Sequence, residues 1–457
     1  MRITNLNCAD DIGASAWLVE VDGCRLLLDA GMHPKHDGNA ALPLFAAAAG
    51  LAVDAIALSH CHHDHVGALP VALRQFPGAR VFVPEQSYFL LPRVLHNSVN
   101  VMKRQRAEAG IAEYPLFDHS DVDQLMQVVQ ACRYRQVVEW GVPPRPRAGP
   151  MPTLEFFDAG HVLGSAGVLV RGRKDSLFYT GDVCFAPQSL LAGARFEEVR
   201  ARVLLTESTR GATARPKGFS REAELARLRD TIAGALSRGA SVLVPAFALG
   251  RTQELLAWLA MQMREGALPR RKVHVGGLGR AFTEIYDQQA HRTERLLPDL
   301  ALQQALELQV LEEGDAQNMS LKGGKLFVTT AGMMTERTAA HDLAVRLMGE
   351  ARQCICFVGY ADPDSPGGRL KASEAGRTFR FSDLAPQVVR RCELHVFDLS
   401  AHAQREELVG FAAGLAPRTV LLGHGDPPAR KWLAGQIARR LPSAQVLQPR
   451  PGESVAL

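Results

Sequence analysis

Short apolar runs separated by turn residues dominate the first two hundred positions. Asp22-Gly23 stands between the first two runs as a hairpin signal. We therefore predict strands at 16–21, 25–29, 55–59, 80–83, 154–158, 167–171, 176–180 and 202–206. The stretch 87–139 is predicted to be a helical excursion from this sheet. Its apolar positions with helical spacing are Val122, Leu125, Met126, Val128 and Val129.

From about residue 210, longer helical patterns alternate with buried strands. Helices are predicted at 221–238 and 252–264, and strands at 241–245, 272–275, 325–330 and 353–359. This alternation favours a parallel α/β layer. Short strands return at 393–398 and 419–422, and a last helix is predicted at 428–441. The order indicates one domain interrupted by a second.

The composition is that of a folded chain. With 457 residues, 47% hydrophobic and 22% charged, the chain is long enough for two or three domains. The net charge of +4 is too small to indicate a nucleic-acid partner by itself. Arg outnumbers Lys, which suits phosphate contacts. A GC-rich genome explains the same bias, so the charge of the chain neither indicates nor excludes a nucleic-acid partner.

No membrane or secretion signal stands out. The first ten residues lack a basic segment followed by an apolar one. The most apolar segment, 40–58, is broken by Pro43, Gly50 and Asp54, so it is interpreted as a helix followed by a strand. The eight cysteines are scattered without CxxC pairs, which indicates reduced thiols. We expect a cytoplasmic protein that does not bind membranes.

A dense group of metal donors follows the strand at 55–59. It runs His60-Cys61-His62-His63-Asp64-His65, and a helical pattern begins after it. Imidazole and carboxylate groups are the usual non-thiolate ligands of zinc. Four donors so close together cannot all serve one tetrahedral ion, but a strand-to-helix turn can divide them between two. The alternative, an accidental surface cluster, is disfavoured by the apolar strand before it.

Two metal ions need further donors at later strand ends. Ala159-Gly160-His161 follows one predicted strand, and Thr180-Gly181-Asp182 closes another. A small residue before each donor allows the backbone to turn sharply there. His161 by itself would be interpreted as a structural histidine, but in this series of strand ends it is predicted to be a ligand, together with Asp182.

These residues resemble the metallo-β-lactamase superfamily. The similarity lies in Leu28-Asp29-Ala30-Gly31, the segment from His60 to His65, His161 and Asp182. It implies an αββα sandwich with the metals at one edge of the two sheets. The chain is also similar to the β-CASP branch of nucleic-acid nucleases, which includes the 3′-end cleavage endonuclease of messenger-RNA processing and its prokaryotic relatives. The matching motifs are Glu207-Ser208-Thr209, Ser400-Ala401-His402 and Gly423-His424-Gly425, with further similarity at 246–254, 331–334 and 357–360.

The resemblance implies a domain plan and a ligand set. A metallo-β-lactamase domain would span 1–208 and 389–457, with a β-CASP domain inserted at 209–388. Two zinc ions are implied as cofactors. One would be held by His60, His62 and His161, the other by Asp64, His65 and His424, and Asp182 would bridge them. Asp29 would orient a ligand histidine.

The implied activity is that of a zinc-dependent ribonuclease. A hydroxide bound to both metals would attack phosphorus. His402, paired with Glu207, would protonate the leaving oxygen as the general acid. A histidine at position 424 is similar to the RNA-directed members. The resemblance therefore implies single-stranded RNA as the partner, with DNA as the alternative polymer, and it allows a homodimer. Endonuclease and 5′ exonuclease action both stay open.

Several features leave alternatives. Gln404 stands where family members usually carry an acid, which puts the tuning of His402 in doubt. Arg251 and Ser400 are candidate phosphate contacts, but a salt bridge and a turn cap explain them as well. Small-molecule hydrolases such as lactonases and thioesterases share the His-Asp cluster. Relatives that have lost their ligands act as scaffolds, whereas every ligand position is filled here.

Overall fold

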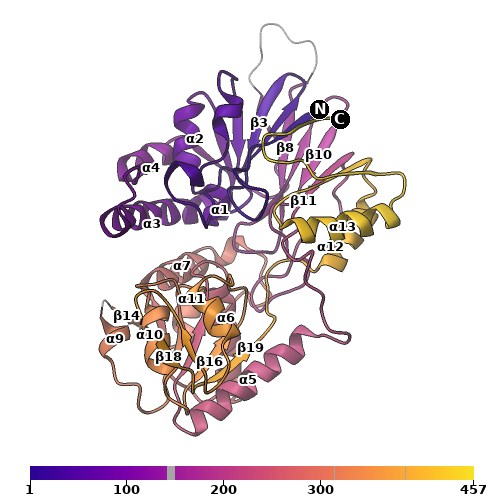
Figure 1. Ribbon diagram of the computed structural model, residues 1–457. Coiled ribbons are helices and arrows are strands. Elements are labelled where there is room, and N and C mark those ends of the chain that lie inside the picture. The colour runs from indigo at the N-terminus through magenta and orange to yellow at the C-terminus, as the bar shows by residue number, and fades with distance from the viewer. Residues whose placement is uncertain (142–149, 313, 386) are drawn as a thin grey trace. The chain divides into compact units, whose positions relative to one another are not determined.

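The computed structural model describes residues 1–141, 150–312, 314–385 and 387–457. The chain forms two compact units (Figure 1). The first unit consists of Met1–Ala186, Gly193–Ala214 and His402–Leu457. The second consists of Pro187–Ala192 and Arg215–Ala401.

Two seven-stranded sheets form the centre of the first unit. The first sheet has the order β22-β1-β2-β3-β4-β5-β6 and the second β21-β20-β11-β10-β9-β8-β7. The strands of the first are β1 (Arg2–Asn5), β2 (Trp17–Val21), β3 (Cys24–Leu28), β4 (Ala55–Ala57), β5 (Arg80–Pro84), β6 (Val129–Cys132) and β22 (Ser454–Ala456). Those of the second are β7 (Val138–Glu139), β8 (Thr153–Asp158), β9 (Ala166–Arg171), β10 (Ser176–Tyr179), β11 (Val203–Thr206), β20 (Thr419–Leu422) and β21 (Gln445–Leu447). Every strand predicted for the first two hundred residues is present.

Helices cover both outer faces of this pair of sheets. They are α1 (His63–Val66), α2 (Leu69–Gln75), α3 (Glu85–Ala109), α4 (His119–Met126), α12 (Arg405–Leu415) and α13 (Pro427–Arg440). Figure 1 shows α2, α3 and α4 on one side of the sheets and α12 and α13 on the other. Trp17 and Leu26 meet Phe156 and Val168 between the sheets, because alternate side chains of a strand point to opposite faces. The αββα sandwich implied by the resemblance is confirmed.

Two local predictions were wrong. In place of a helix before β4, the chain forms two short 3-10 helices, η1 (Gly38–Ala41) and η2 (Phe45–Ala48). Pro43 lies between them and cannot donate a backbone hydrogen bond to a continuous helix. The predicted helical region also extended too far along the chain, because α4 ends at Met126 and Val129 begins β6.

The second unit contains a six-stranded parallel sheet of order β14-β13-β15-β12-β16-β19. Its strands are β12 (Val242–Pro245), β13 (Val273–Gly276), β14 (Leu308–Leu311), β15 (Leu326–Thr329), β16 (Cys354–Phe357) and β19 (Glu393–Val396), and β17 (Thr378–Arg380) with β18 (Gln387–Val389) forms a separate hairpin. Its helices are α5 (Arg221–Ser237), α6 (Arg251–Arg264), α7 (Gly277–Gln288), η3 (Ala290–Arg292), α8 (Leu302–Ala305), α9 (Asp315–Asn318), α10 (Ala339–Leu347) and α11 (Pro366–Ala372). The predicted parallel layer is confirmed.

The strand order places helices on both faces of this sheet. The connections through α6 and α7 move along the sheet in one direction, and those through α9 and α10 return in the other. Because such crossovers are right-handed, the two pairs of helices cover opposite faces. Leu343 and Leu347 of α10 pack on Phe327 and Ile355. The neighbouring strands β12 and β15 therefore send their helices to opposite faces, which makes their carboxyl ends a topological switch point.

Within the described ranges, none of the helices has both the length and the apolar character needed to cross a membrane.

Candidate metal centre

The predicted donors follow the carboxyl ends of strands in both sheets of the first unit. His60 comes after β4, and His62, Asp64 and His65 stand at or in α1 directly behind it. On the second sheet, His161 follows β8, Asp182 follows β10, Glu207 follows β11 and His424 follows β20. Gly160 and Gly181, with φ of 65° and 53°, make the turns that glycine was expected to make there.

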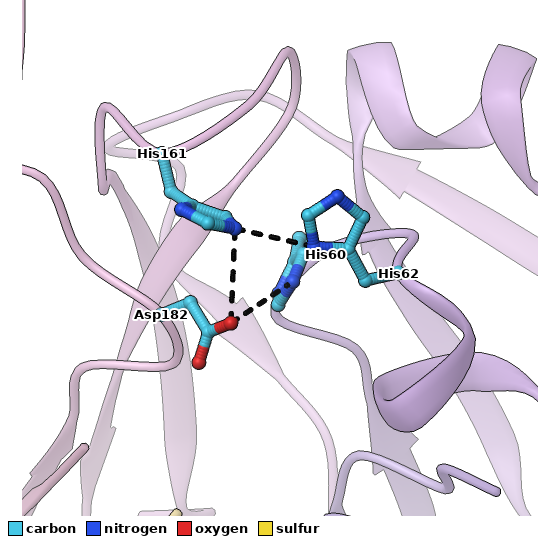
Figure 2. Close-up of side chains that lie close together, drawn as sticks. All are labelled: His60, His62, His161 and Asp182. Atoms are coloured by element: carbon cyan, nitrogen blue, oxygen red, sulfur yellow. Dashed lines mark hydrogen bonds and ion pairs between the residues drawn. The ribbon is translucent and has the colours of Figure 1, made fainter. Parts of the chain in front are cut away.

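One group of donors consists of His60, His62, His161 and Asp182 (Figure 2). One ligand atom from each of them lies within 4.8 Å of all the others. His161 Nε2 is 3.2 Å from His62 Nδ1 and 3.7 Å from Asp182 Oδ2. His60 Nε2 is 3.6 Å from the same carboxylate oxygen. Figure 2 shows the three rings and the carboxylate facing a common centre.

The second group consists of Asp64, His65 and His424. His424 Nε2 lies 3.3 Å from His65 Nε2 and 3.2 Å from Asp64 Oδ2. His424 is reached through a left-handed backbone with φ of 45°. Its position is fixed by its own carbonyl, which accepts a hydrogen bond from the Ser208 N–H at 3.0 Å. Donors that are far apart in the sequence thus meet at one point.

Asp182 stands between the two groups. Its Oδ2 faces His60 and His161, whereas its Oδ1 lies 3.5 Å from His65 Nε2 and 3.1 Å from His424 Nδ1. The side chain is 2% exposed. One carboxylate oxygen for each group is the arrangement that a bridging ligand needs.

Asp29 holds the second group from behind. Its Oδ2 accepts hydrogen bonds from His65 Nδ1 at 2.8 Å, Tyr179 Oη at 2.7 Å and Ser59 Oγ at 2.8 Å. Its Oδ1 accepts from the Ser59 backbone N–H at 2.6 Å. A proton on His65 Nδ1 leaves the lone pair of Nε2 directed at the site, which is the tautomer that a metal ligand needs. Asp29 therefore contacts His65, and its role in orienting a metal ligand stays a prediction.

Ser59 and Tyr179 were not singled out from the sequence. Ser59 Oγ also lies 3.0 Å from His60 Nδ1, so it touches a donor as well as Asp29. The adjacency of Ser59 to His60 was the only available signal. Tyr179 occupies an inward position of a predicted strand, where a phenol ring is usually core.

Close backbone packing fixes the segment that carries four of the donors. The N–H groups of Ser15, Ala30 and Met32 bond to the carbonyls of Asp64, His65 and His63 at 2.9–3.1 Å. A Cβ atom added to Gly31 would lie 1.6 Å from the Asp64 carbonyl oxygen. Glycine at position 31 is therefore required by contact distance.

His402 and Glu207 form a pair at the edge of the first group. His402 Nδ1 is 3.1 Å from Glu207 Oε2, and Glu207 Oε1 accepts from the Val183 N–H at 2.7 Å. The His402 ring lies 4.6 Å from that of His161. Gln404 donates its N–H to Glu407 at the start of α12. The acidic partner of His402 is thus Glu207, and the departure at Gln404 leaves that pair in place.

The charges of the cluster perturb one another. Burial by itself lowers the pKa of His402, but the carboxylates of Glu207 and Asp182 raise it to about 9. Burial raises the pKa of Asp182, and the imidazoles of His424 and His65 outweigh it and hold that pKa well below its ordinary value. Burial and the neighbouring His65 lower the pKa of His60 well below its ordinary value. A neutral imidazole beside an ionised carboxylate is the state that binds a metal.

Orphaned polar atoms test whether the cluster fits a cation. His60 Nε2 and Asp182 Oδ1 are buried, and neither forms a hydrogen bond of acceptable geometry among the described residues, although His424 Nδ1 lies 3.1 Å from the Asp182 oxygen. Buried polar atoms are almost always satisfied, so each such exception needs an explanation. Imidazole and carboxylate donors converging on the orphaned atoms suit a divalent metal. The residues present therefore fit a metal site.

Arg251 and Ser400 belong to the second unit, whereas the first unit alone supplies every donor of the cluster. Arg251 opens α6, is 8% exposed and lies near the buried carboxylate of Glu254. The Ser400 carbonyl accepts from Arg221 at 3.0 Å. Their expected role in phosphate binding stays a prediction.

The sandwich and its donor set are typical of the metallo-β-lactamase fold with a divalent-metal site. Three family models match the chain: the metallo-beta-lactamase superfamily at 9–232, the Beta-Casp domain at 252–370 and the Zn-dependent metallo-hydrolase RNA specificity domain at 387–443. The chain belongs to the metallo-β-lactamase superfamily and, by its Beta-Casp domain, to the β-CASP branch.

Similar proteins come from eukaryotes and bacteria. The chain is 26% identical to cleavage and polyadenylation specificity factor subunit 3 of Dictyostelium discoideum over 100% of this chain and 57% of that protein. It is 26% identical to an endoribonuclease of Neurospora crassa over 93% of this chain and 52% of that protein. The chain thus spans about half the length of these two relatives. A ribonuclease of Thermus thermophilus is 29% identical, with all of both chains covered.

A solved structure supports the fold. The crystal structure of a protein of unknown function from Enterococcus faecalis matches 100% of this chain and 99% of its own, with a TM-score of 0.59 and 14% identity. At that identity the match shows the fold alone.

Replacing Asp29 tests how much the cluster depends on its supporting carboxylate. Asp29→Asn removes the charge that accepts from His65, Tyr179 and Ser59. We expect roughly 10- to 100-fold weaker metal binding, because partners behind a ligand orient it. Competition with a chromophoric chelator measures the affinity. Asp123→Asn, at an exposed position of the same unit, serves as the control, and equal affinity of both variants would contradict the role of Asp29.

Gly31→Ala tests the close packing behind the donors. The added methyl group must displace the Asp64 carbonyl, so we expect the purified variant to carry less metal and to melt at a lower temperature. Gly78→Ala is the matched control, since a Cβ there meets no atom within 4 Å. Metal analysis and thermal unfolding measure both. Normal metal content in Gly31→Ala would show that the segment adapts without loss of the site.

Proposed function

We propose that the chain is a zinc-dependent ribonuclease that hydrolyses phosphodiester bonds of single-stranded RNA. In this assignment two zinc ions occupy the two donor groups. His60, His62 and His161 hold one, Asp64, His65 and His424 hold the other, and Asp182 is shared. The β-CASP insertion is proposed to span about 209–388. The eight free thiols of the whole chain suit a reducing compartment such as the cytoplasm.

The observation that carries the proposal is the His402–Glu207 pair beside the donors. Hydrolysis by metal ions alone needs only the ligands. A histidine held by a buried carboxylate at the edge of the cluster adds a proton donor. Expulsion of an alkoxide from a phosphodiester requires such a proton, because the alkoxide is a strong base.

Each residue then has a definite task. Bound zinc supplies Lewis acidity toward the phosphate and an activated water. Glu207 holds His402 by Nδ1, which leaves Nε2 to deliver a proton to the departing 3′ oxygen and yields a 5′ phosphate. Asp29 keeps His65 in the ligating tautomer. Ser59 positions His60 through Nδ1.

The choice of RNA rests on the comparisons. An RNA specificity domain model matches the carboxyl-terminal part, and relatives carry the names endoribonuclease and ribonuclease. DNA is the alternative polymer, and either endonuclease action or degradation from a 5′ end is consistent with this site.

Incubation of the zinc-loaded protein with RNA and DNA oligomers labelled at either end tests the activity. We expect cleavage of single-stranded RNA into products with 5′ phosphates, and loss of that cleavage on removal of metal by a chelator. Product lengths distinguish internal cuts from stepwise shortening. Intact RNA together with hydrolysis of a lactone or thioester would replace the proposal with a small-molecule hydrolase.

His402→Ala separates the proton donor from the metal ligands. We expect bound zinc to be unchanged and the cleavage rate to fall roughly 10²- to 10⁴-fold, the usual contribution of general acid catalysis. Metal analysis and single-turnover cleavage give the two quantities. His119→Ala, a histidine remote in sequence from these motifs, is the control. Loss of zinc in His402→Ala would make His402 a ligand and remove the assigned role.

A further inference from the structure

Two aromatic side chains of the second unit are exposed where most aromatics of the chain are buried. Among the described residues, the exposed large hydrophobic side chains are Leu44, Val128, Val137, Phe247, Leu296, Tyr360, Leu384 and Val396. Phe247 at 40% and Tyr360 at 59% exposed are the two aromatics in that set. Two exposed aromatic rings that follow neighbouring strands of one sheet are available for contact with a ligand.

Both residues follow neighbouring strands of the parallel sheet. Phe247 comes two residues after the end of β12, and Tyr360 three residues after the end of β16. The register pairs Leu243 with Ile355, so β12 and β16 end next to each other in the sheet. Neighbouring strands lie about 4.8 Å apart. The rings are therefore carried by adjacent strand ends of one rigid layer.

Hydrogen bonds fix the segments that bear the two rings. The Phe247 carbonyl accepts from Thr252 Oγ1 at 2.7 Å and from the Thr252 N–H at 3.2 Å. Tyr360 Oη donates to Asp362 Oδ2 at 3.2 Å, and Asp362 is 7% exposed. A ring that is held before it meets a ligand loses little entropy on binding.

Phe247 lies at the topological switch point between β12 and β15. The segment after β15 passes next to it, since a Cβ on Gly332 would come within 3.3 Å of Phe247 Cδ2. Ligands of open parallel sheets bind outside the carboxyl ends of strands at such a point. Beside Tyr360, a Cβ on Gly359 meets no atom within 4 Å, so the surface there is open.

The same sheet edge favours anions. The twelve-residue helix α7 begins at Gly277 after β13 and has no side-chain cap. A Cβ at Gly277 would meet no atom within 4 Å, and Arg280 in the first turn is exposed. The positive end of a helix dipole with a guanidinium beside it attracts phosphate. Exposed rings and a positive helix end along the same sheet edge are complementary to a polymer of bases and phosphates.

We propose that Phe247 and Tyr360 form a stacking platform for unpaired nucleobases of the substrate strand. The platform rests on the proposed ribonuclease function and names the part of the second unit that binds the polymer. The bases stack on the two rings, and the backbone phosphates follow the edge toward the start of α7. Stacking needs no base-specific hydrogen bond, so the platform accepts any sequence and requires single-stranded character.

Equilibrium binding tests the platform apart from catalysis. The protein is the zinc-loaded His402→Ala variant, so that the RNA stays intact. One probe is a labelled ten-nucleotide oligoriboadenylate, and the other is a ribose-phosphate oligomer of equal length without bases. We expect Phe247→Ala and Tyr360→Ala each to weaken binding of the oligoriboadenylate roughly tenfold and to leave binding of the abasic oligomer unchanged.

Matched variants decide between stacking and other effects. Phe247→Tyr and Tyr360→Phe keep a ring and should bind as the parent does, whereas Leu384→Ala removes an exposed apolar side chain elsewhere in the unit and should have no effect. Equal losses for both oligomers, or no loss for either, would overturn the platform and leave the rings as a contact for a protein. Base-dependent binding by a protein that cleaves no nucleic acid would instead refute the nuclease proposal and keep the platform.

Discussion

The structure of the metal centre depends on the buried carboxylate of Asp182. An ionised carboxylate out of water costs several kcal/mol unless opposite charges or donors surround it. One carboxylate oxygen of Asp182 faces His60 and His161, and the other faces His65 and His424. Since His60 and His65 come from the first sheet and the other two from the second, this charge ties together the ends of both sheets.

Asp29 is a second buried carboxylate, and it contacts the donor His65 from behind. It is fully buried and receives three side-chain hydrogen bonds and one from a backbone N–H, so both of its oxygens are satisfied by the protein itself. The contact of Gly31 with the Asp64 carbonyl places this carboxylate and the donor segment at a fixed distance. The ligands are therefore held by the fold before any cation binds, and little reorganisation is needed when one does.

The sequence could predict the donors because their chemistry restricts the residue types. His161 and Asp182 were found by asking where a strand would end, and His424 and His402 came from the resemblance. Ser59 and Tyr179 were not predicted, because a serine hydroxyl or a tyrosine phenol in a strand has many other structural roles. The helix expected before β4 failed at Pro43, where the propensity of an alanine-rich segment lost to a missing backbone donor. Strand order in the second unit was beyond reach, because periodicity shows that a strand is buried and not which strand lies beside it. Without that order the exposure of Phe247 and Tyr360 could not be seen, as both stand in segments whose apolar character is typical of core.

A metal site by itself cannot distinguish RNA from DNA or single strands from double strands, and the parallel sheet of the second unit is relevant to that choice. On the proposed assignment two cations and a proton donor would recognise a phosphodiester, and that group is the same in RNA and DNA and in single and double strands. Discrimination must come from groups that contact bases or sugars. In a duplex each base face is covered by its neighbours, so rings such as Phe247 and Tyr360 can meet a base only where the strand is unpaired. On the proposed assignment, selection for single strands thus follows from the switch point of the second unit, and bond cleavage from the strand ends of the first. On this assignment the second unit supplies the base contacts that the donors of the first unit cannot provide.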